Sequence, residues 1–150
     1  GPDEGGYRAR LEALVRQHEL SEEVLFLGEV DDTRKWALFD RCELFLAPSR
    51  TENFGMAIAE ALQSGRPVIT TTGTPWRELV ERDAGWWIEP QPEALAQALR
   101  EATAVPVEAL RQKGSRGQML MNEKYAWEQI AARSVALYRA ILQEEQNGPR

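Results

Sequence analysis

Short apolar runs alternate with stretches of helical periodicity from the start of the chain to Ile88, and this alternation constrains the fold more than any other feature. Unbroken apolar runs are typical of strands buried on both faces of a parallel sheet. Strands that alternate with helices predict right-handed β-α-β units. We therefore predict an α/β fold: a Rossmann-like parallel sheet with helices on both faces. The predicted strands are 24–27, 44–47, 67–72 and 86–88.

Capping and breaking residues indicate where the helices begin and end. Asp31 or Asp32 is a suitable N-cap, Gly65 is a suitable stop, and Pro75 suits the first position of a helix. The chain beyond Pro90 has only helical patterns. Before Pro90, helices are predicted at 7–18 and 55–64, with a third that carries 36–39 and a fourth that starts at 75. The predicted carboxy-terminal helices are 92–102, 107–123 and 127–144.

Three of the five tryptophans bear on the choice between packing and binding. Trp36 and Trp127 lie on amphipathic helices, so we expect them to pack in the core. Trp76 is the exception, because it directly follows a loop on the side of the sheet where ligands bind.

Composition narrows the function class. The 150 residues are 43% apolar, which predicts a single domain over 1–150. Acidic residues outnumber basic ones, 24 to 18, and the basic residues are scattered, so we expect no nucleic-acid partner. No apolar run approaches the roughly 20 residues of a membrane helix. A single cysteine, Cys42, indicates a reducing compartment, and we expect a cytoplasmic protein.

Parallel sheets bind ligands beyond the carboxyl ends of their strands, which here are the loops after Gly28, Ala47 and Thr72. The loop after Ala47 leads through residues 53–55 into a helix. A helix amino terminus presents unpaired N–H groups and partial positive charge, so a phosphate or diphosphate is expected to dock at Asn53, Phe54 and Gly55.

Two glutamates flank this helix start. Glu60 lies on the helix, about 200° from Ile58 of the apolar stripe, so it points away from the sheet. A carboxylate at that position can accept hydrogen bonds from two ribose hydroxyls. Glu52 lies in the loop before the helix and is expected to face the group beyond the phosphates.

Glu52 and Glu60, separated by seven residues and followed by Gly-Arg-Pro-Val-Ile at 65–69, resemble the signature of glycosyltransferase family 4. This family is retaining and has the GT-B fold. The resemblance covers nearly the whole chain: 1–2 resemble the end of the second family strand, 26–28 the third strand, and 127–130 the start of the terminal helix. The chain is thereby identified as a partial carboxy-terminal, donor-binding domain.

The resemblance implies a role for each matching residue. It places the catalytic Glu52 against the donor sugar and Glu60 on the ribose. The amides of Asn53, Phe54 and Gly55 contact the sugar and diphosphate.

Three more positions complete the expected donor-binding set. Val30 would line the base, and Gly73 and Thr74 lie in the loop after the third strand. The segment 72–79, with 85–87, is similar to members that build bacterial surface polysaccharides, and a role in polysaccharide or lipopolysaccharide synthesis is therefore expected.

The family chemistry needs no cofactor and no protein nucleophile. The donor is a nucleotide-diphosphate sugar, the anomeric configuration is retained, and the leaving diphosphate helps to take the acceptor proton. No Asp-x-Asp motif occurs in the sequence, and Asp31 and Asp32 are better explained as helix caps, so we predict no metal. Two roles remain open for Glu78: contact with the ligand and interaction with a helix dipole.

Parts of the family pattern lie upstream of Gly1: a strand, a helix, a second strand and a basic pair that neutralises the diphosphate. We therefore expect this chain to be inactive alone and to be part of a longer enzyme. An amino-terminal domain would bind the acceptor, a sugar or glycolipid, and the terminal helix 127–144 would pack back toward it. An incomplete sheet also favours self-association. The longer enzyme would be cytoplasmic, with a peripheral position at the inner face of the membrane.

Two alternatives remain from the sequence. One is another GT-B enzyme, a sugar-nucleotide epimerase or a phosphorylase. The other is a non-catalytic nucleotide-binding module. Release of free nucleotide only in the presence of an acceptor separates the transferase from the other GT-B enzymes. A full-length protein with intact Glu52 that turned over no donor with any acceptor would favour the non-catalytic module.

Overall fold

The computed structural model describes Asp3 and residues 5–147, with side chains described through Gln143. The chain divides into two compact units at the boundary between Leu38 and Phe39. In chain order, the elements are α1 (Tyr7–Gln17), α2 (Asp32–Arg41), β1 (Phe45–Ala47), α3 (Met56–Gln63), β2 (Val68–Thr71), α4 (Glu78–Glu81), β3 (Gly85–Ile88), α5 (Pro92–Ala104), α6 (Val107–Leu120), the π-helical turn η1 (Met121–Tyr125) and α7 (Trp127–Asn147).

The carboxy-terminal unit is built on a parallel sheet with the strand order β1-β2-β3. Leu46 of β1 pairs with Ile69 of β2, and Ile69 pairs with Trp86 of β3. Within the described residues, β1 therefore has a partner on one side only. The α/β prediction and three of the four predicted strands are confirmed.

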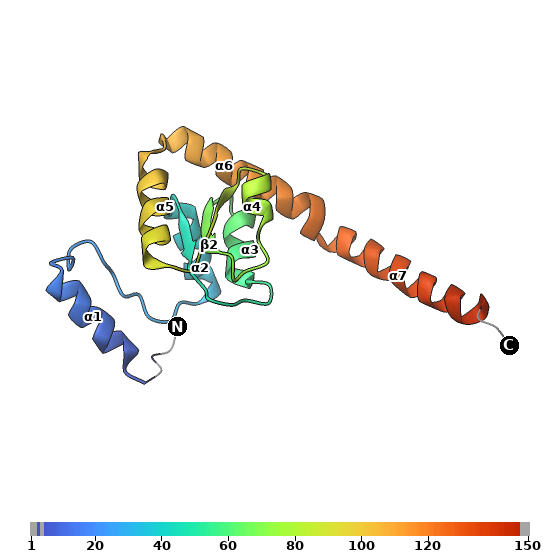
Figure 1. Cartoon of the computed structure of the whole chain (residues 1–150), viewed down its shortest axis with the longest axis horizontal. Helices are drawn as coiled ribbons and strands as arrows, with labels where there is room; N and C mark the ends of the chain where they lie inside the picture. Colours follow the sequence, from blue (N-terminus) through green and yellow to red (C-terminus); the bar gives the residue numbers. More distant parts are fainter. Residues whose placement is uncertain (1–2, 4, 148–150) are drawn as a thin grey trace. The chain divides into compact units, whose positions relative to one another are not determined.

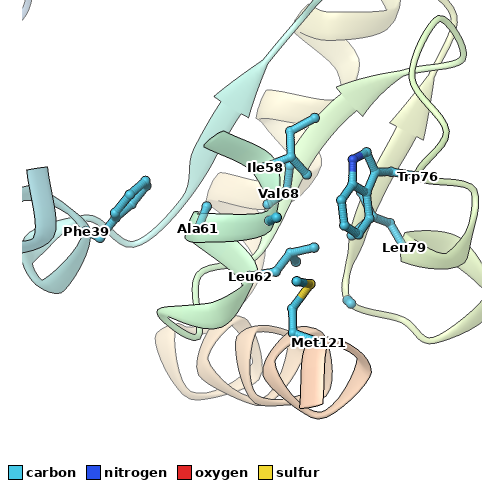
Figure 2. Close-up of a cluster of buried hydrophobic side chains, with 10 residues drawn as sticks. Phe39, Ile58, Ala61, Leu62, Val68, Trp76, Leu79 and Met121 are labelled. Carbon is cyan, nitrogen blue, oxygen red and sulfur yellow. The ribbon is translucent and has the colours of Figure 1, made fainter. Parts of the chain in front are cut away.

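Successive residues of β2 point to opposite faces of the sheet, so they belong to two separate cores. Val68 faces the core that α3 and α4 build, while Ile69 faces the core that α5 builds. The helices α3 and α5 thus cover opposite faces, as Figure 1 shows. Figure 2 shows the first core, in which the largest side chains are Phe39, Ile58, Leu62, Val68, Trp76, Leu79 and Met121.

The prediction of a strand at 24–27 is wrong. Val24 to Leu27 have no strand conformation, and Leu25 is 78% exposed. A parallel strand needs a neighbour for its backbone N–H and C=O groups, and the described amino-terminal unit contains no strand. Phe26 lies instead beneath the guanidinium of Arg8, 5.9 Å from the ring centre.

The helix boundaries confirm two of the predicted signals and correct one. The Asp31 carboxylate accepts a 2.8 Å hydrogen bond from the Arg34 amide and caps α2. Gly65, with φ of +69°, ends α3 as predicted. Pro75 does not begin α4, because the Thr74 amide and hydroxyl both donate to the Thr71 carbonyl and close a turn first.

The helix predicted over 107–123 changes geometry before its end. α6 stops at Leu120, and η1 continues the chain to Tyr125. η1 carries Met121, 8% exposed, into the core of Figure 2 and brings Tyr125 beside Trp76. Periodicity predicts a continuous helix here, whereas packing selects the wider turn.

The expected packing of Trp36 and Trp127 is wrong for this chain. Trp36 is 43% exposed and Trp127 is 82% exposed. All side chains of α7 that are described, through Gln143, are exposed. Trp76, in contrast, is 1% exposed and lies at the centre of the core.

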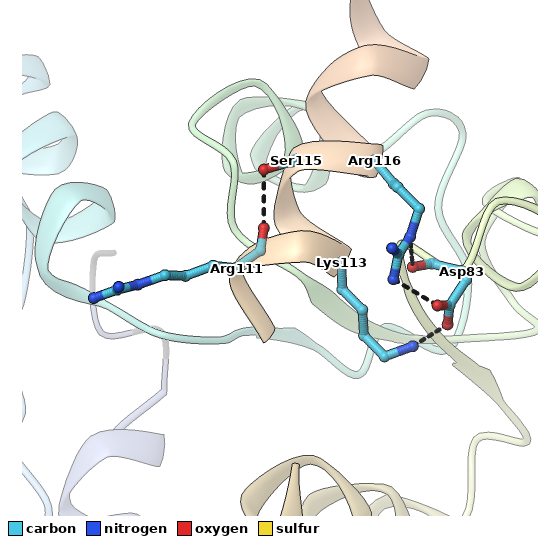
Figure 3. Close-up of polar contacts among 5 residues, drawn as sticks. All are labelled: Asp83, Arg111, Lys113, Ser115 and Arg116. Carbon is cyan, nitrogen blue, oxygen red and sulfur yellow. Dashed lines mark hydrogen bonds and ion pairs between the residues drawn. The ribbon is translucent and has the colours of Figure 1, made fainter. Parts of the chain in front are cut away.

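Asp83 connects the turn between α4 and β3 to α6. Figure 3 shows its carboxylate accepting from Lys113 and, at 2.5 Å, from Arg116, while the Arg116 Nε donates to the Asp83 carbonyl. Hydrogen bonding to Lys113, with the charges of Lys113 and Arg116, outweighs partial burial and lowers the pKa of Asp83. These contacts hold α6 against the loop that precedes β3.

Candidate functional site

The loops that follow β1 and β2 meet at the carboxyl edge of the sheet, where the sequence predicts a site. The Glu52 amide donates to the Gly73 carbonyl at 3.0 Å. At the base of the loops, the Thr70 hydroxyl donates to the Ala47 carbonyl at 2.8 Å, and the Thr71 hydroxyl donates to the Ser49 carbonyl. β2 thus fixes the loop that carries Glu52.

At Gly73 the backbones of the two loops lie close together. A Cβ atom built on Gly73 would lie 2.0 Å from the Arg50 carbonyl oxygen and 3.2 Å from the Thr51 amide nitrogen. Only a residue without a side chain lets the two backbones come this close. Neighbouring Thr74 is buried, and its hydroxyl lies 3.3 Å from the Thr70 hydroxyl.

The β1 loop ends at the amino terminus of α3. Gly55 is the N-cap residue, with φ of +82° and ψ of +68°, a left-handed conformation that favours glycine. Its carbonyl accepts from the Ile58 and Ala59 amides, and no side chain in the described structure caps this helix start. The N–H groups of Met56 and Ala57 precede the first helical hydrogen bond, so they have no acceptor within the helix and form a site for negative charge.

The predicted side chains around this helix start differ in exposure. Glu52 and Asn53 are exposed, Phe54 is half-buried, and Gly55 is buried. Glu60, one turn into α3, is half-buried. The structure thus brings the residues 52–55 together with Gly73 and the first turns of α3.

Val30 is half-buried within the amino-terminal unit. Gly28, two residues before Val30, has φ of +69°, and a Cβ there would lie 3.7 Å from Arg8 Nη1. The assignment of Val30 to a base pocket stays a prediction.

An aromatic cluster behind the helix start was not predicted from the sequence. The Phe54 ring lies 5.2 Å from the Trp76 ring and 5.5 Å from the Tyr125 ring, measured between centroids. The Trp76 indole Nε1 donates a 2.5 Å hydrogen bond to the Phe54 carbonyl. The position of Trp76 after a ligand-side loop was the only sequence signal for this cluster, since Tyr125 is 49 residues away in sequence.

Glu78 is held by two residues of η1, an interaction that neither of its predicted roles included. Its carboxylate accepts a 2.8 Å hydrogen bond from the Tyr125 hydroxyl and pairs with Lys124. Partial burial opposes ionisation of Glu78, but the hydrogen bonds and the charges of Lys124 and Arg82 outweigh it and lower the pKa of the carboxyl. Burial has the largest effect on Tyr125, and the hydrogen bond to Glu78 and the negative charge of Glu78 add to it. Together they raise the pKa of the Tyr125 hydroxyl to about 12. Glu78 therefore connects α4 to η1.

We expect Glu78→Gln to be less stable than the wild type by about 1–2 kcal/mol at pH 7, with the difference shrinking as the pH falls toward 3. The folded pKa of Glu78 is lowered, so its contribution is present above the unfolded pKa and is lost as the pH falls through the folded value. Urea denaturation at a series of pH values measures this. Glu81→Gln is the control, because the ion pair that Glu81 forms within the described part of the chain is an exposed 3.3 Å contact with Arg77. A difference that stays constant with pH would contradict the expectation.

Across the described residues, no group of three or more His, Cys, Asp or Glu side chains is arranged to hold a metal ion. None of the described helices combines the length and the apolar character needed to cross a membrane.

The sequence matches the family described as glycosyl transferases group 1 over residues 1–118. The chain belongs to this family. The match confirms the predicted resemblance, and solved structures confirm the fold. The chain superposes on sucrose-phosphate synthase from Thermosynechococcus elongatus with a TM-score of 0.79 and 28% identity, over 95% of this chain and 36% of that one.

Two further proteins resemble the chain, one in sequence and one in fold. The lipopolysaccharide core biosynthesis mannosyltransferase LpcC of Rhizobium leguminosarum bv. viciae is 33% identical over 135 residues, which is 89% of this chain and 38% of that protein. The carboxy-terminal domain of a group 1 family protein, LpcC of Francisella tularensis, shares the fold, with a TM-score of 0.72 and 24% identity over 83% of this chain and 65% of that one. The chain spans 26–38% of the length of the first three curated relatives.

Proposed function

We propose that this chain binds the nucleotide-diphosphate sugar donor of a retaining group 1 glycosyltransferase. The observation that carries the proposal is the amino terminus of α3, which follows Gly55 and has no side-chain cap among the described residues, at the edge where the loops after β1 and β2 meet. This is a ready site for a diphosphate, because backbone N–H groups and the helix dipole both favour negative charge.

The order of residues along the loop and helix suggests how the donor lies. Glu60, on α3, would bind the ribose, and Glu52, in the preceding loop, would face the transferred sugar. The diphosphate would lie between them, against the amides of Asn53, Phe54 and Gly55. Gly73 and Thr74 would support this loop from the side, and Val30 would line the base.

The chemistry follows from that placement. As the bond between the sugar and the diphosphate breaks, negative charge develops on the leaving diphosphate, and the fixed N–H groups at the start of α3 stabilise it. Such preorganised donors cost no reorganisation during the reaction. The acceptor attacks the same face of the sugar, so no protein nucleophile is needed, and Glu52 orients the sugar.

The acceptor chemistry rests on relatives. The Rhizobium relative is named for lipopolysaccharide core synthesis. An Escherichia coli relative, WcaL, which is 34% identical over 65% of this chain, is named for colanic acid biosynthesis. We therefore propose hexosyl transfer in bacterial surface polysaccharide or lipopolysaccharide synthesis. The half-buried single thiol of Cys42 fits action in the cytoplasm.

The exposed terminal helix fits a role in joining the donor domain to the rest of an enzyme. We propose that α7 packs toward an acceptor-binding domain. Its exposed apolar side chains support this role; Leu137 is 60% exposed and Tyr138 is 65% exposed. Such a surface on a soluble helix is usually covered by a partner.

Calorimetric titration with UDP, GDP and ADP tests the donor site. In the natural-length protein we expect one nucleotide to bind, and Glu60→Ala to weaken that binding by about 1–3 kcal/mol through loss of charge-assisted hydrogen bonds to the ribose. Glu108→Ala is a matched control, because Glu108 lies on the first turn of α6 and its ion pair in the described structure is an exposed 3.6 Å contact with Arg111. Binding that is indifferent to Glu60, or binding of none of the three nucleotides, would contradict the assignment.

A further inference from the structure

We propose that Trp76 is a positioning residue, whose indole N–H fixes the peptide between Phe54 and Gly55 so that the Gly55 amide is held toward the outer phosphate of the donor. The inference rests on the proposed function and adds to it a residue that does not itself touch the donor.

The first step is the hydrogen bond itself. The Trp76 indole is 1% exposed, and its Nε1 lies 2.5 Å from the Phe54 carbonyl oxygen. A peptide unit is planar, so its carbonyl and the next N–H point in opposite directions. Holding the Phe54 oxygen therefore fixes the direction of the Gly55 N–H.

The second step is that the indole is itself immobile. Its ring lies 5.4 Å from the Tyr125 ring, and the Tyr125 hydroxyl donates to Glu78. Phe54 packs on both rings. The hydrogen-bond donor thus belongs to a packed cluster that joins the β1 loop, the β2 loop and η1.

The third step is that this particular peptide needs an external restraint. Gly55 has the left-handed conformation, and glycine moves between conformations more freely than any other residue. Glu52 and Asn53, just before it, are exposed, and no side chain in the described structure caps the start of α3. The indole restrains this peptide through its hydrogen bond to the Phe54 carbonyl. That hydrogen bond also polarises the peptide, which makes the Gly55 N–H a stronger donor.

The placement of the donor makes the effect specific to one phosphate. With the ribose at Glu60 and the sugar near Glu52, the Gly55 amide lies on the side of the outer phosphate. A nucleoside diphosphate has that phosphate, and the matching monophosphate lacks it. Loss of the restraint should therefore lower the affinity for the diphosphate and leave the affinity for the monophosphate unchanged. General loosening of the site would lower both affinities.

The test uses Trp76→Phe in the natural-length protein, which keeps an aromatic ring and removes the indole N–H. Calorimetry compares the affinities for the nucleoside diphosphate and the monophosphate of the base that the wild type prefers. We expect roughly a tenfold loss for the diphosphate, the scale of one hydrogen bond, and less than about a twofold change for the monophosphate.

Trp87→Phe is the matched control. The Trp87 indole donates a 3.1 Å hydrogen bond to the Thr74 carbonyl, which also lies in the β2 loop. The next residue is Pro75, which has no N–H, so that peptide presents no donor to orient. Trp87→Phe should lower the melting temperature while leaving the diphosphate-to-monophosphate affinity ratio at the wild-type value.

The outcomes separate the inference from the proposed function. An unchanged affinity ratio in Trp76→Phe, or an equal loss for both nucleotides, would overturn the positioning role. A wild-type protein that binds neither nucleotide would overturn the proposed function itself. If Trp76→Phe does not fold, NMR of the wild type decides: the Trp76 indole N–H resonance should shift more with the diphosphate than with the monophosphate, and equal shifts would overturn the role.

Discussion

Gly114→Ala is expected to destabilise the protein by about 3 kcal/mol, the upper range for overpacking a core. A Cβ on Gly114 would lie 1.9 Å from the Gly65 carbonyl oxygen and 2.7 Å from its carbon. Both atoms are backbone, in the turn between α3 and β2, so no side chain can rotate away. Instead α6 must move off this turn, which would disturb the core around Leu62 and Met121.

Gly117→Ala is the control, because it lies on the same face of α6 and meets a side chain instead. Its Cβ would lie 2.7 Å from the Cδ2 of Leu62, the far end of a flexible side chain. Alanine also gains about 1 kcal/mol of helix propensity over glycine, which offsets the repacking cost. We expect a net change below about 1 kcal/mol. Chemical denaturation of both variants measures the difference, and equal effects would show that the backbone contact at Gly114 is not decisive.

Gly73→Ala is expected to weaken binding of the nucleoside diphosphate at least about tenfold and to cost about 2 kcal/mol of stability. The added methyl would collide with the Arg50 carbonyl at 2.0 Å and separate the two loops. That separation breaks the hydrogen bond from the Glu52 amide to the Gly73 carbonyl. The loop that leads to α3 would lose its lateral support, and the amides at its end would no longer be preorganised.

Thr72→Ala is the neighbouring control. Among the described residues, the one hydrogen bond of the Thr72 hydroxyl is an exposed 3.3 Å contact with Glu89, so the variant should change neither stability nor nucleotide binding by more than about 0.5 kcal/mol. Calorimetric titration and chemical denaturation of the two variants give both quantities. Wild-type affinity in a folded Gly73→Ala protein would mean that contact between the loops does not support the donor site.

Elements with strong local signals were predictable from the sequence. The apolar runs that became β1, β2 and β3 and the stop at Gly65 follow from short-range patterns that act within a few residues. The run at 24–27 has an equally strong pattern, yet it forms no strand, because a strand also needs a neighbour that periodicity cannot supply. The same limit explains Trp127, whose helix is amphipathic but lacks a covering surface within the described residues.

The sequence by itself determined the alternation of strands and helices, the family, and the loop that leads through Glu52 into α3. Only the tertiary structure decided what holds that loop. The hydrogen bond from Trp76 to Phe54 and the attachment of Glu78 to η1 join residues 22 and more than 40 positions apart. Such contacts depend on how the helices pack, and packing is set by the shape of the whole core, which no local pattern of residues encodes.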